Sequence, residues 1–390
     1  MVSLLLAIIY LAFVSLGLPD SLLGAAWPIM QQQMAVPLSF AGIIAMVVSG
    51  GTIISSLLSD RLTKKLGAGL VTAVSVLMTA AAFVGFSVSH SFWMLCLFAV
   101  PYGLGAGAVD AALNNFVALH FSSRHMNWLH CCWGVGAAVS PYIMGHSLTG
   151  GASWNSGYRT VAMLQMGLAA VLFLSLPLWK KQAAAASEEK SRTPAKKLPD
   201  IFKIKGVNYV LAAFFGYCAL EVTTGLWASS FLVLQRGVNP ETAAAYASFF
   251  FIGITAGRFL CGFVADKIGD RNMIRIGIII TLLGIFALWL PLKSDWLCLN
   301  GLIVIGIGCA PIYPAIIHAT PANFGKENAQ AIIGVQMASA YLGATFMPPL
   351  FGLAANHISV GLYPAFLLFF AVLMLLMTEK LSRTIPEQAA

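Results

Sequence analysis

Apolar blocks of roughly 20 residues recur along the whole chain, and short polar clusters separate them. A helix of that length crosses about 30 Å of hydrocarbon at 1.5 Å per residue. Of the 390 residues, 59% are hydrophobic and 9% are charged, whereas a soluble domain carries roughly a quarter charged residues. So few charges cannot cover a soluble surface, and the chain is predicted to be a polytopic helical membrane protein.

The polar clusters predict an all-α membrane protein with twelve transmembrane helices in two six-helix bundles. The predicted spans are 3–30, 37–59, 67–88, 92–121, 126–148, 157–180, 205–234, 242–265, 273–292, 295–318, 328–354 and 359–380. Between the sixth and seventh spans, residues 180–200 are rich in Lys, Glu, Ala and Pro, a composition typical of a disordered linker. The predicted domains are an N-terminal bundle (1–180), a cytoplasmic linker (181–204) and a C-terminal bundle (205–390).

The positive charges predict the orientation in the membrane. Of the 22 Lys and Arg residues, 18 fall on one side of the predicted spans, and only Arg159, Arg236 and Lys293 fall on the other. The positive-inside rule therefore places both termini and the linker in the cytoplasm. The same rule explains the net charge of +8, so no nucleic-acid partner is expected.

The sequence shows none of the common motifs for nucleotide binding, metal binding or nucleophilic catalysis. The seven cysteines form no CxxC pair, and no nucleotide loop, metal cluster or catalytic triad is found. The chain is therefore not expected to be an enzyme or to hold a metal or cofactor. Energy for any transport would come from an ion gradient or from the gradient of the solute.

The two halves of the sequence resemble each other. Residues 56–67 read SLLSDRLTKKLG and residues 262–273 read GFVADKIGDRNM, and in each an acid at a helix end precedes several cations. The seventh span repeats the first, because Glu221 and Gly225 stand four residues apart, as do Asp20 and Gly24. Two like halves suggest a pseudo-two-fold axis and a binding site at the midplane between them.

These loops resemble the G-x-x-x-D-[RK]-x-G-x-[RK]-[RK] signature of the major facilitator superfamily, and the 6+6 layout extends the resemblance over the whole chain. The second copy keeps both glycines, whereas the first has Ser56 and Thr63 where glycines are usual. The resemblance implies a conformational latch that holds cytoplasmic helix ends together when the carrier faces outward. Its residues here would be Asp60, Arg61, Lys64, Lys65, Gly262, Asp266, Lys267 and Arg271.

Three acids and one arginine lie inside predicted spans, namely Asp20, Asp110, Glu221 and Arg258. A charge at the centre of a span costs about 2.5–3.5 kcal/mol, so such residues face a cavity or a partner and mark solute or ion paths. A buried acid that exchanges its proton near the working pH suits a proton-coupled carrier, and these acids are predicted to carry the proton. The alternative for Glu221 and Arg258 is an ion pair that only holds two helices together.

The fourth span places polar groups on one helix face. Asp110 and Asn114 stand four residues apart, one turn of helix, and Asn115 follows directly. A carboxylate followed by amides suits a ligand rich in hydroxyl groups. Alternatively, the amides bond other helices. Pro19, which precedes Asp20, is expected to interrupt the first helix because it has no N–H donor.

Within the superfamily, the chain resembles the fucose permease group of sugar–proton symporters and its sodium-dependent glucose-carrier relatives. Asp20 falls where that group has an acid implicated in sugar and proton handling. Asp110, in VDAALNNF, falls where the group reads Glu-Thr-Ala-Ala-Asn-Pro-Phe, with the acid as the proton site. The stretches 217–227, 128–141 and 257–262 resemble its seventh, fifth and eighth helices.

Further candidates lie on spans that line the central cavity in this architecture. Trp27, Trp133 and Trp227 would stack on a sugar ring or pack within the bundle. His130 would bind the substrate, relay a proton or only be hydrogen-bonded within the bundle. The C-terminal half of the substrate site would come from Glu221, Tyr313, Gln336 and Tyr341.

The predicted function is a proton-coupled symporter that imports a small polar, sugar-like solute by alternating access. Protonation of Asp110, with Asp20, would let the loaded carrier reorient. The alternatives are a proton-coupled antiporter that exports drugs or metabolites, a sodium-coupled sugar symporter, and a non-transporting receptor or scaffold. The protein is expected to be a monomer in the bacterial inner membrane, with the solute and the lipid bilayer as its partners.

Overall fold

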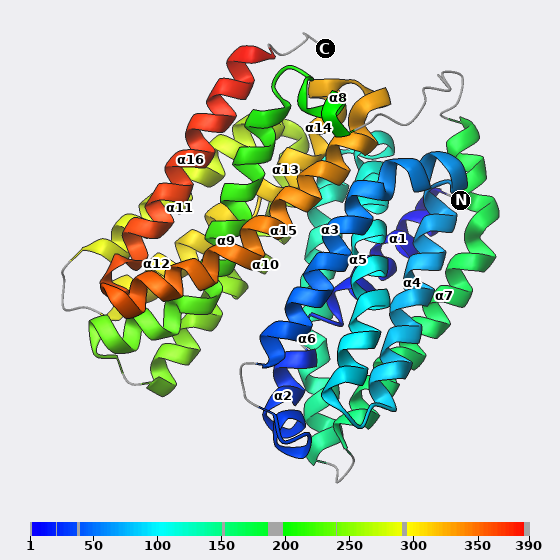
Figure 1. The fold of residues 1–390 in the computed structure, drawn as a ribbon. Helices are drawn as coiled ribbons and strands as arrows, with labels where there is room; N and C mark the ends of the chain where they lie inside the picture. Colours follow the sequence, from blue (N-terminus) through cyan, green and yellow to red (C-terminus); the bar gives the residue numbers. More distant parts are fainter. Residues whose placement is uncertain are drawn as a thin grey trace. The chain divides into compact units, whose positions relative to one another are not determined.

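The computed structural model describes residues 2–20, 22–36, 40–149, 153–185, 198–238, 240–290 and 295–385. Every regular element among them is a helix, so the all-α prediction is confirmed (Figure 1). The helices are α1 (Val2–Gly17), α2 (Leu22–Gln33), α3 (Phe40–Leu66), α4 (Ala68–Ser87), α5 (Phe92–His120), α6 (Ser123–Thr149), α7 (Trp154–Ala185), α8 (Leu198–Phe202), α9 (Val207–Arg236), α10 (Pro240–Ile268), α11 (Asp270–Trp289), α12 (Asp295–Cys309), α13 (Ile312–His318), α14 (Thr320–Phe324), α15 (Lys326–His357) and α16 (Tyr363–Thr384), with a 3-10 turn at Val360–Leu362.

Ten helical segments of the described chain are long and apolar enough to cross a membrane. Two predicted spans are each divided into two helices. The first is broken between α1 and α2, where the chain turns at Leu18–Asp20, so the predicted interruption at Pro19 is confirmed. The tenth is broken between α12 and α13, where Pro311 precedes the second helix.

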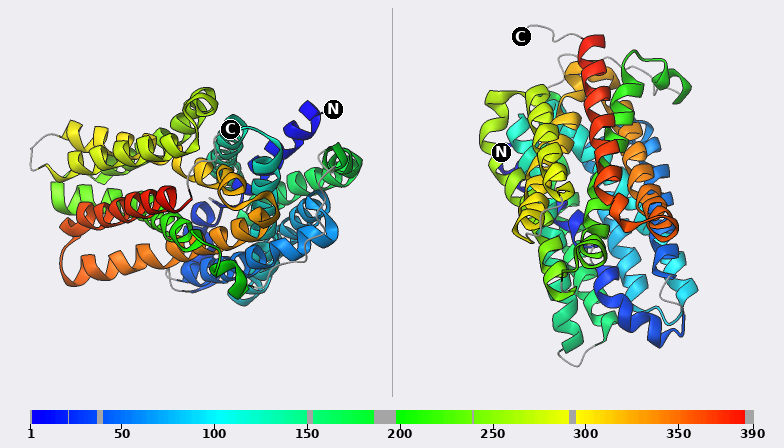
Figure 2. Two further views of the ribbon diagram at one scale, coloured as in Figure 1. Left: turned by 90° about the horizontal axis from the view of Figure 1, so that it is seen from above. Right: turned by 90° about the vertical axis from the view of Figure 1, so that its left-hand side faces the viewer.

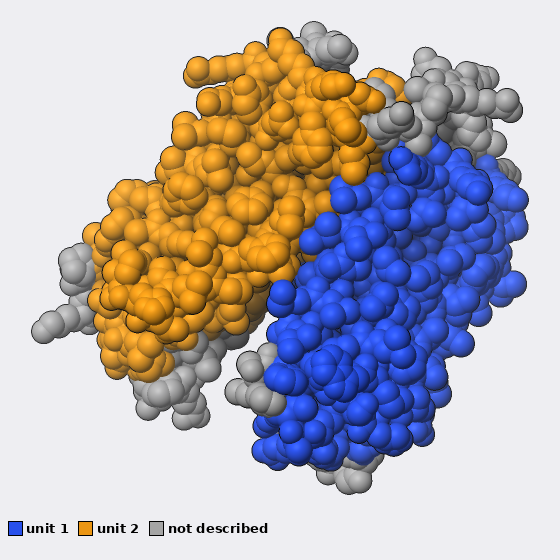
Figure 3. Space-filling view, in the orientation of Figure 1, with its two compact units in different colours: residues 1–116, 129–195 blue, residues 117–128, 196–390 orange. Residues whose placement is uncertain are grey.

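The chain forms two compact units, coloured separately in Figure 3. Unit 1 comprises Met1–Phe116 and Leu129–Ala195, and unit 2 comprises Val117–Trp128 and Lys196–Ala390. Residues 186–197 of the predicted linker lie outside the described residues, so the predicted domain boundaries stay a prediction. The described parts of that linker are helical up to Ala185, where α7 ends, and again from Leu198 to Phe202 in α8.

In unit 1, α4 packs against α7, and glycines bring other helices close together. A Cβ atom at Gly17 of α1 would meet the Trp133 carbonyl oxygen, and one at Gly136 of α6 would meet the Val14 carbonyl oxygen. Backbone therefore packs on backbone between α1 and α6, as small residues allow in membrane helices. Gly103 of α5 likewise permits close approach of helices, since its neighbour is the α3 backbone at Val48.

In unit 2, α9 packs against α15, α16 and α10, and α11 packs against α12 and α16. Figure 2 shows α16, drawn in red, running alongside its neighbours. The glycines of the tenth span again face backbone: a Cβ atom at Gly306 of α12 would meet α10 at Phe250. Gly103 of the fourth span and Gly306 of the tenth thus have the same packing role in the two units.

The two copies of the repeated loop turn at different points. In the second copy, Gly269 ends α10 with φ 81° and ψ 152°, a conformation that favours glycine. The first copy has Thr63 at the corresponding position, and α3 continues to Leu66. The chain then turns at Gly67 with φ 82° and ψ 153°. The missing glycine of the first copy therefore lengthens its helix by about one turn.

Candidate functional site

Asp20 lies at the break between α1 and α2 and binds two aromatic donors. The indole Nε1 of Trp133, on α6, donates to its Oδ2 at 2.9 Å, and the Tyr102 hydroxyl, on α5, donates to its Oδ1 at 3.2 Å. Asp20 itself is exposed, whereas the preceding Pro19 is buried. The helix break thus leaves this carboxylate accessible while two helices fix its orientation.

The close packing of α1 on α6 explains how Asp20 reaches Trp133. Gly17 of α1 lies against the backbone of Trp133 itself, three residues before Asp20 in the sequence. A larger side chain at Gly17 would separate the two helices. The glycine and the helix break therefore act together to place the carboxylate beside the indole.

A second polar cluster centres on Asp110 of α5, which is 5% exposed. The Asn114 amide donates from Nδ2 to the Asp110 Oδ1 at 2.7 Å. The Oδ1 of Asn114 lies 3.0 Å from Nε2 of His130, on α6, so the His130 N–H is the donor in that bond. The rings of His130 and Phe13 also meet edge to face, with their centroids 5.3 Å apart. The result is a buried chain of polar groups from His130 through Asn114 to the acid.

The two clusters share the same two helices of unit 1. His130 and Trp133 stand three residues apart on α6, about one turn, so they lie on the same face. On α5, Tyr102 precedes Asp110 by about two turns. The structure therefore places the candidates Asp20 and Trp133 in one of these clusters and Asp110, Asn114 and His130 in the other. Tyr102 was not among them, although its position on the helix of Asp110 could have indicated it.

Two other candidates of unit 1 lie elsewhere. Trp27 is 4% exposed and belongs to an apolar cluster with Met30 and Phe83. This placement matches the alternative that Trp27 packs within the bundle. Asn115 is 7% exposed, and its Oδ1 has no hydrogen-bond partner among the described residues.

In unit 2, Glu221 of α9 forms an ion pair with Arg258 of α10. The Oε1 of Glu221 lies 3.2 Å from a terminal guanidinium nitrogen of Arg258, and the Tyr217 hydroxyl lies 3.4 Å from the same nitrogen. Arg258 is 3% exposed, so the pair is largely removed from water. Tyr217 was not singled out as a candidate, although it stands one turn before Glu221 on the same helix.

The remaining C-terminal candidates lie in different surroundings. Tyr313 packs its ring on Tyr217, with centroids 5.8 Å apart, and its hydroxyl lies 3.2 Å from the sulfur of Met337. Gln336 is fully buried and bonds Thr320 at 3.1 Å. Trp227 donates to the Pro348 carbonyl oxygen at 3.0 Å. Tyr341 is half-buried on α15.

In the first copy of the signature loop, the ion pair of the acid lies within its own helix, α3. Asp60 is buried at the cytoplasmic end predicted for α3, and Nζ of Lys64 lies 3.0 Å from its carboxylate, one turn away. Arg61 and Lys65 are exposed.

The second copy binds the segment Val117–Trp128, which belongs to unit 2. Asp266 accepts hydrogen bonds at 3.0 Å from the Ser122 hydroxyl and from the Arg124 backbone N–H. Asp270 accepts from Ser123 at 2.7 Å and lies 2.6 Å from Nδ1 of His318. The two acids of this loop thus hold one short segment through three of its groups, and Asp270 also contacts His318, whose Nε2 lies 3.1 Å from the Phe121 carbonyl oxygen.

Glycine at position 262 also has a packing reason. A Cβ atom there would run into the Trp128 indole, which donates from Nε1 to the Phe259 carbonyl oxygen at 3.4 Å. Lys267 is exposed. Arg271 contacts other groups: it donates to the Ile385 carbonyl oxygen at 2.6 Å and to Oδ1 of Asn323 at 3.4 Å.

In the described part of the chain, no group of three or more His, Cys, Asp and Glu side chains could hold a metal ion.

Comparison with known proteins gives consistent matches. A sequence profile described as Major Facilitator Superfamily matches residues 9–247 and 209–381. The cis,cis-muconate transport protein of Acinetobacter baylyi is 24% identical over 345 residues, which cover 83% of this chain and 80% of that protein. The glucose/mannose transporter GlcP of Bacillus subtilis is 22% identical over 326 residues, with 82% and 79% covered.

Two solved structures have the same fold. The proton:xylose symporter XylE, bound to 6-bromo-6-deoxy-D-glucose, matches with a TM-score of 0.79 at 11% identity and covers 98% of this chain and 95% of its own. FucP in its outward conformation matches with a TM-score of 0.74 at 14% identity, with 97% and 98% covered. Identities this low show the fold alone.

Proposed function

Because the chain belongs to the Major Facilitator Superfamily and resembles its fucose permease branch, we propose that it is a proton-coupled symporter for a small polar, sugar-like solute. The chain is a multi-pass membrane transporter. Proton coupling, the solute and alternating access belong to the proposal. So do a monomeric state, residence in a bacterial inner membrane and cytoplasmic termini.

The observation that carries this proposal is the pair of polar clusters on α5 and α6. Asp110 is buried and hydrogen-bonded to Asn114, while Asp20 is exposed and hydrogen-bonded to Trp133. A buried acid is expensive to keep charged inside a membrane protein and marks an ion or solute path. Asp110 is therefore assigned the coupling proton, and Asp20 the first contact with solute and proton.

Each hydrogen-bonding group of the clusters has a role in this proposal. Asn114 bridges the acid and His130, so protonation of Asp110 changes which groups can accept hydrogen bonds along the chain. The remaining lone pairs of the Asp20 carboxylate would accept hydrogen bonds from solute hydroxyl groups, and the indole face of Trp133 would pack on an apolar ring face. Loss of the negative charge then lets the loaded carrier reorient.

The signature loops are assigned the latch role that the resemblance implies. The contacts of Asp266 and Asp270 with Ser122, Ser123 and the Arg124 backbone support this assignment for the second copy. The bond between Ser122 and Asp266 joins two exposed side chains, so it can break and form again, whereas Ser123 is buried. In the first copy, Asp60 forms an ion pair with Lys64, one turn further along α3.

A small organic acid is the second candidate solute. Arg258 offers a buried cation in unit 2, and it is held by Glu221, whose protonation would leave the guanidinium able to bind a carboxylate. The relatives' names cover both classes, since one is a glucose/mannose transporter and another a muconate transport protein.

Uptake into proteoliposomes tests the proposal. We expect an inward proton gradient to drive accumulation of one member of a panel of hexoses, hexuronates and dicarboxylates, accompanied by alkalinisation outside. Replacement of sodium by potassium at constant pH should leave the rate unchanged. Solute-driven proton movement in the opposite direction would indicate an antiporter, and dependence on sodium would replace the proton as the coupling ion.

A further inference from the structure

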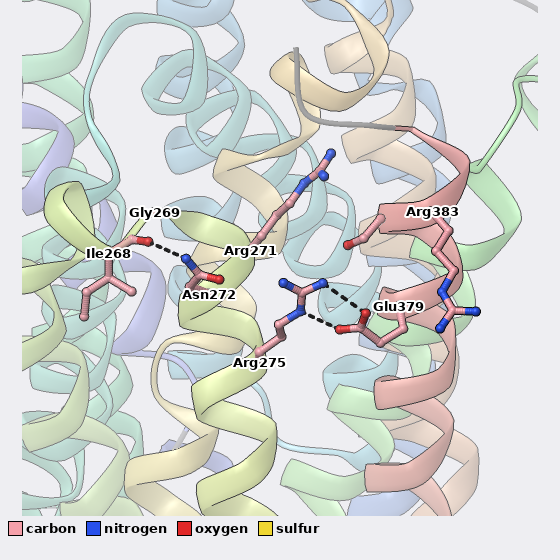
Figure 4. A pocket seen from close by; sticks show the side chains of 8 residues that line it. Ile268, Gly269, Arg271, Asn272, Arg275, Glu379 and Arg383 are labelled. Carbon is pink, nitrogen blue, oxygen red and sulfur yellow. Dashed lines mark hydrogen bonds and ion pairs between the residues drawn. The ribbon is translucent and has the colours of Figure 1, made fainter. Parts of the chain in front are cut away.

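A basic pocket lies between α11 and α16 of unit 2, apart from the polar clusters described above. It has a volume of about 310 Å³ and is lined by Arg271, Asn272, Arg275, Glu379, Ser382 and Arg383. Three of these side chains are cationic and one is anionic. Figure 4 shows the arginines and Glu379 around the pocket.

One arginine is neutralised within the pocket. Arg275 and Glu379 form a two-point ion pair, with Nε 2.5 Å from Oε1 and a terminal nitrogen 3.0 Å from Oε2. This geometry fixes both side chains as a planar fork on a carboxylate. Two positive charges, those of Arg271 and Arg383, remain without a second carboxylate in the lining.

The two remaining arginines are suited to an anion with several oxygens. Arg271 is half-buried and held in place by the Ile385 carbonyl oxygen and Asn323, and a guanidinium has five N–H donors, more than these contacts use. Arg383 is exposed on α16, one turn after Glu379. With the Asn272 amide and the Ser382 hydroxyl, they offer the donors that a phosphate group accepts.

The surroundings favour a phosphate that carries acyl chains. From the pocket, α11 continues with the exposed apolar side chains of Ile276, Ile279 and Leu283, and α16 approaches it with those of Phe369, Val372 and Leu376. Each set recurs every three to four residues, so each forms one helix face. The pocket lies where α11 begins and α16 ends, which the positive charges of the sequence predict to be the cytoplasmic headgroup level.

We propose that this pocket binds the phosphate headgroup of an anionic phospholipid, whose acyl chains lie along the apolar faces of α11 and α16. Basic pockets between membrane helices on the cytoplasmic side recognise such headgroups. The site is separate from solute binding, and it uses Arg271, a residue that the signature alone would assign to the latch.

Lipid binding to the purified full-length protein tests this inference. In detergent, native mass spectrometry and thermal melting would be recorded with dioleoyl phosphatidylglycerol, dioleoyl phosphatidylcholine or inorganic phosphate. We expect phosphatidylglycerol to bind at least about tenfold more tightly than phosphatidylcholine, because two unneutralised arginines face the headgroup. Inorganic phosphate at millimolar concentration should not reproduce its stabilisation.

The double variant Arg271→Gln with Arg383→Gln keeps the Arg275–Glu379 pair and should lose that preference. Lys203→Gln removes an exposed cation outside the pocket and should retain it. A second variant, Asn272→Asp, adds a negative charge while leaving all arginines, and it decides the matter if the double variant does not fold. Unchanged preference in Asn272→Asp, or equal stabilisation by inorganic phosphate, would overturn the lipid site whatever the outcome of the uptake assays.

Discussion

The carboxyl group of Asp110 accepts a hydrogen bond from Asn114 in a site that is 5% exposed. Asp110→Asn keeps the size of the side chain and an oxygen that can accept this bond, but it removes the exchangeable proton. We therefore expect solute exchange without a gradient to continue, while accumulation driven by a proton gradient falls to the background level. Both are measured as radiolabelled uptake into proteoliposomes.

The matched control for this change is Asp200→Asn. Asp200 lies on α8, is exposed and pairs with Lys203, so its replacement should leave both assays at the wild-type level. Full proton-driven accumulation by the Asp110 variant would remove Asp110 from the coupling mechanism.

Variants of the ion pair between Glu221 and Arg258 distinguish a packing role of the pair from a transport role. Removing one partner of a buried pair leaves an uncompensated charge, which costs about 3–5 kcal/mol. Glu221→Gln and Arg258→Gln should each lower the melting temperature in detergent, and the double variant should recover most of the loss. We expect the double variant to remain inactive in uptake, because neither charge is present to act on solute or proton.

Active transport by the stable double variant would mean that the pair only holds α9 and α10 together. The sequence identified both charged residues, because ionisable groups inside apolar spans stand out. It did not identify Tyr217 or Tyr102, whose ring atoms resemble those of the many aromatic residues in the spans. Their spacing from Asp110 and Glu221 was a weak signal, and the hydrogen bonds to Asp20 and Arg258 distinguish these two tyrosines in the structure.

At the scale of helices, close packing of α1 on α6 determines where Asp20 lies. Gly136→Ala adds a Cβ atom against the backbone of Val14, which cannot move without the helix, so we expect a loss of about 1–3 kcal/mol in stability. Gly167→Ala, on α7, adds the same atom where nothing lies within 4 Å. Alanine is the better helix former by about 1 kcal/mol, so that variant should be neutral or more stable.

The two alanine variants thus share one chemical change, but only Gly136→Ala should lower the melting temperature. Solute affinity should fall only for Gly136→Ala, because Asp20 and Trp133 separate when the helices do. A loss of stability at Gly167 equal to that at Gly136 would contradict the packing explanation.

Helix existence was predictable from hydropathy, but helix ends depended on single residues. The break at Pro19 followed from its missing N–H donor, whereas the break between α12 and α13 was not expected. Helix α3 runs about one turn further than α10 for a local reason, because Thr63 continues a helix at the position where Gly269 ends one. Such differences lie in the sequence, but the apolar pattern does not show how far each helix runs.

At the scale of the whole molecule, the order of residues does not indicate which unit a segment packs with. Val117–Trp128 connects two helices that otherwise belong to unit 1, yet its contacts are with unit 2. Asp266, Asp270 and His318 make these contacts, and they lie more than a hundred residues further along the sequence. Hydrogen bonds between residues this far apart in the sequence could not be predicted from hydropathy or from the spacing of residues along one helix.

The Arg124 backbone N–H reports directly on this connection, because it donates to Asp266 at 3.0 Å. Asp266→Asn removes the charge from an acceptor whose side chain is 32% exposed, so the bond should weaken by about 1 kcal/mol or less. We expect hydrogen exchange in peptides covering 121–128 to quicken by up to roughly fivefold, read by mass spectrometry. Asp60→Asn changes the corresponding acid of the first copy, whose ion pair with Lys64 is local, and should leave exchange in these peptides unchanged. Equal exchange in the wild type and the Asp266 variant would show that Ser123, Asp270 and the Trp128 ring hold the segment without Asp266, and the latch role would then pass from Asp266 to those groups.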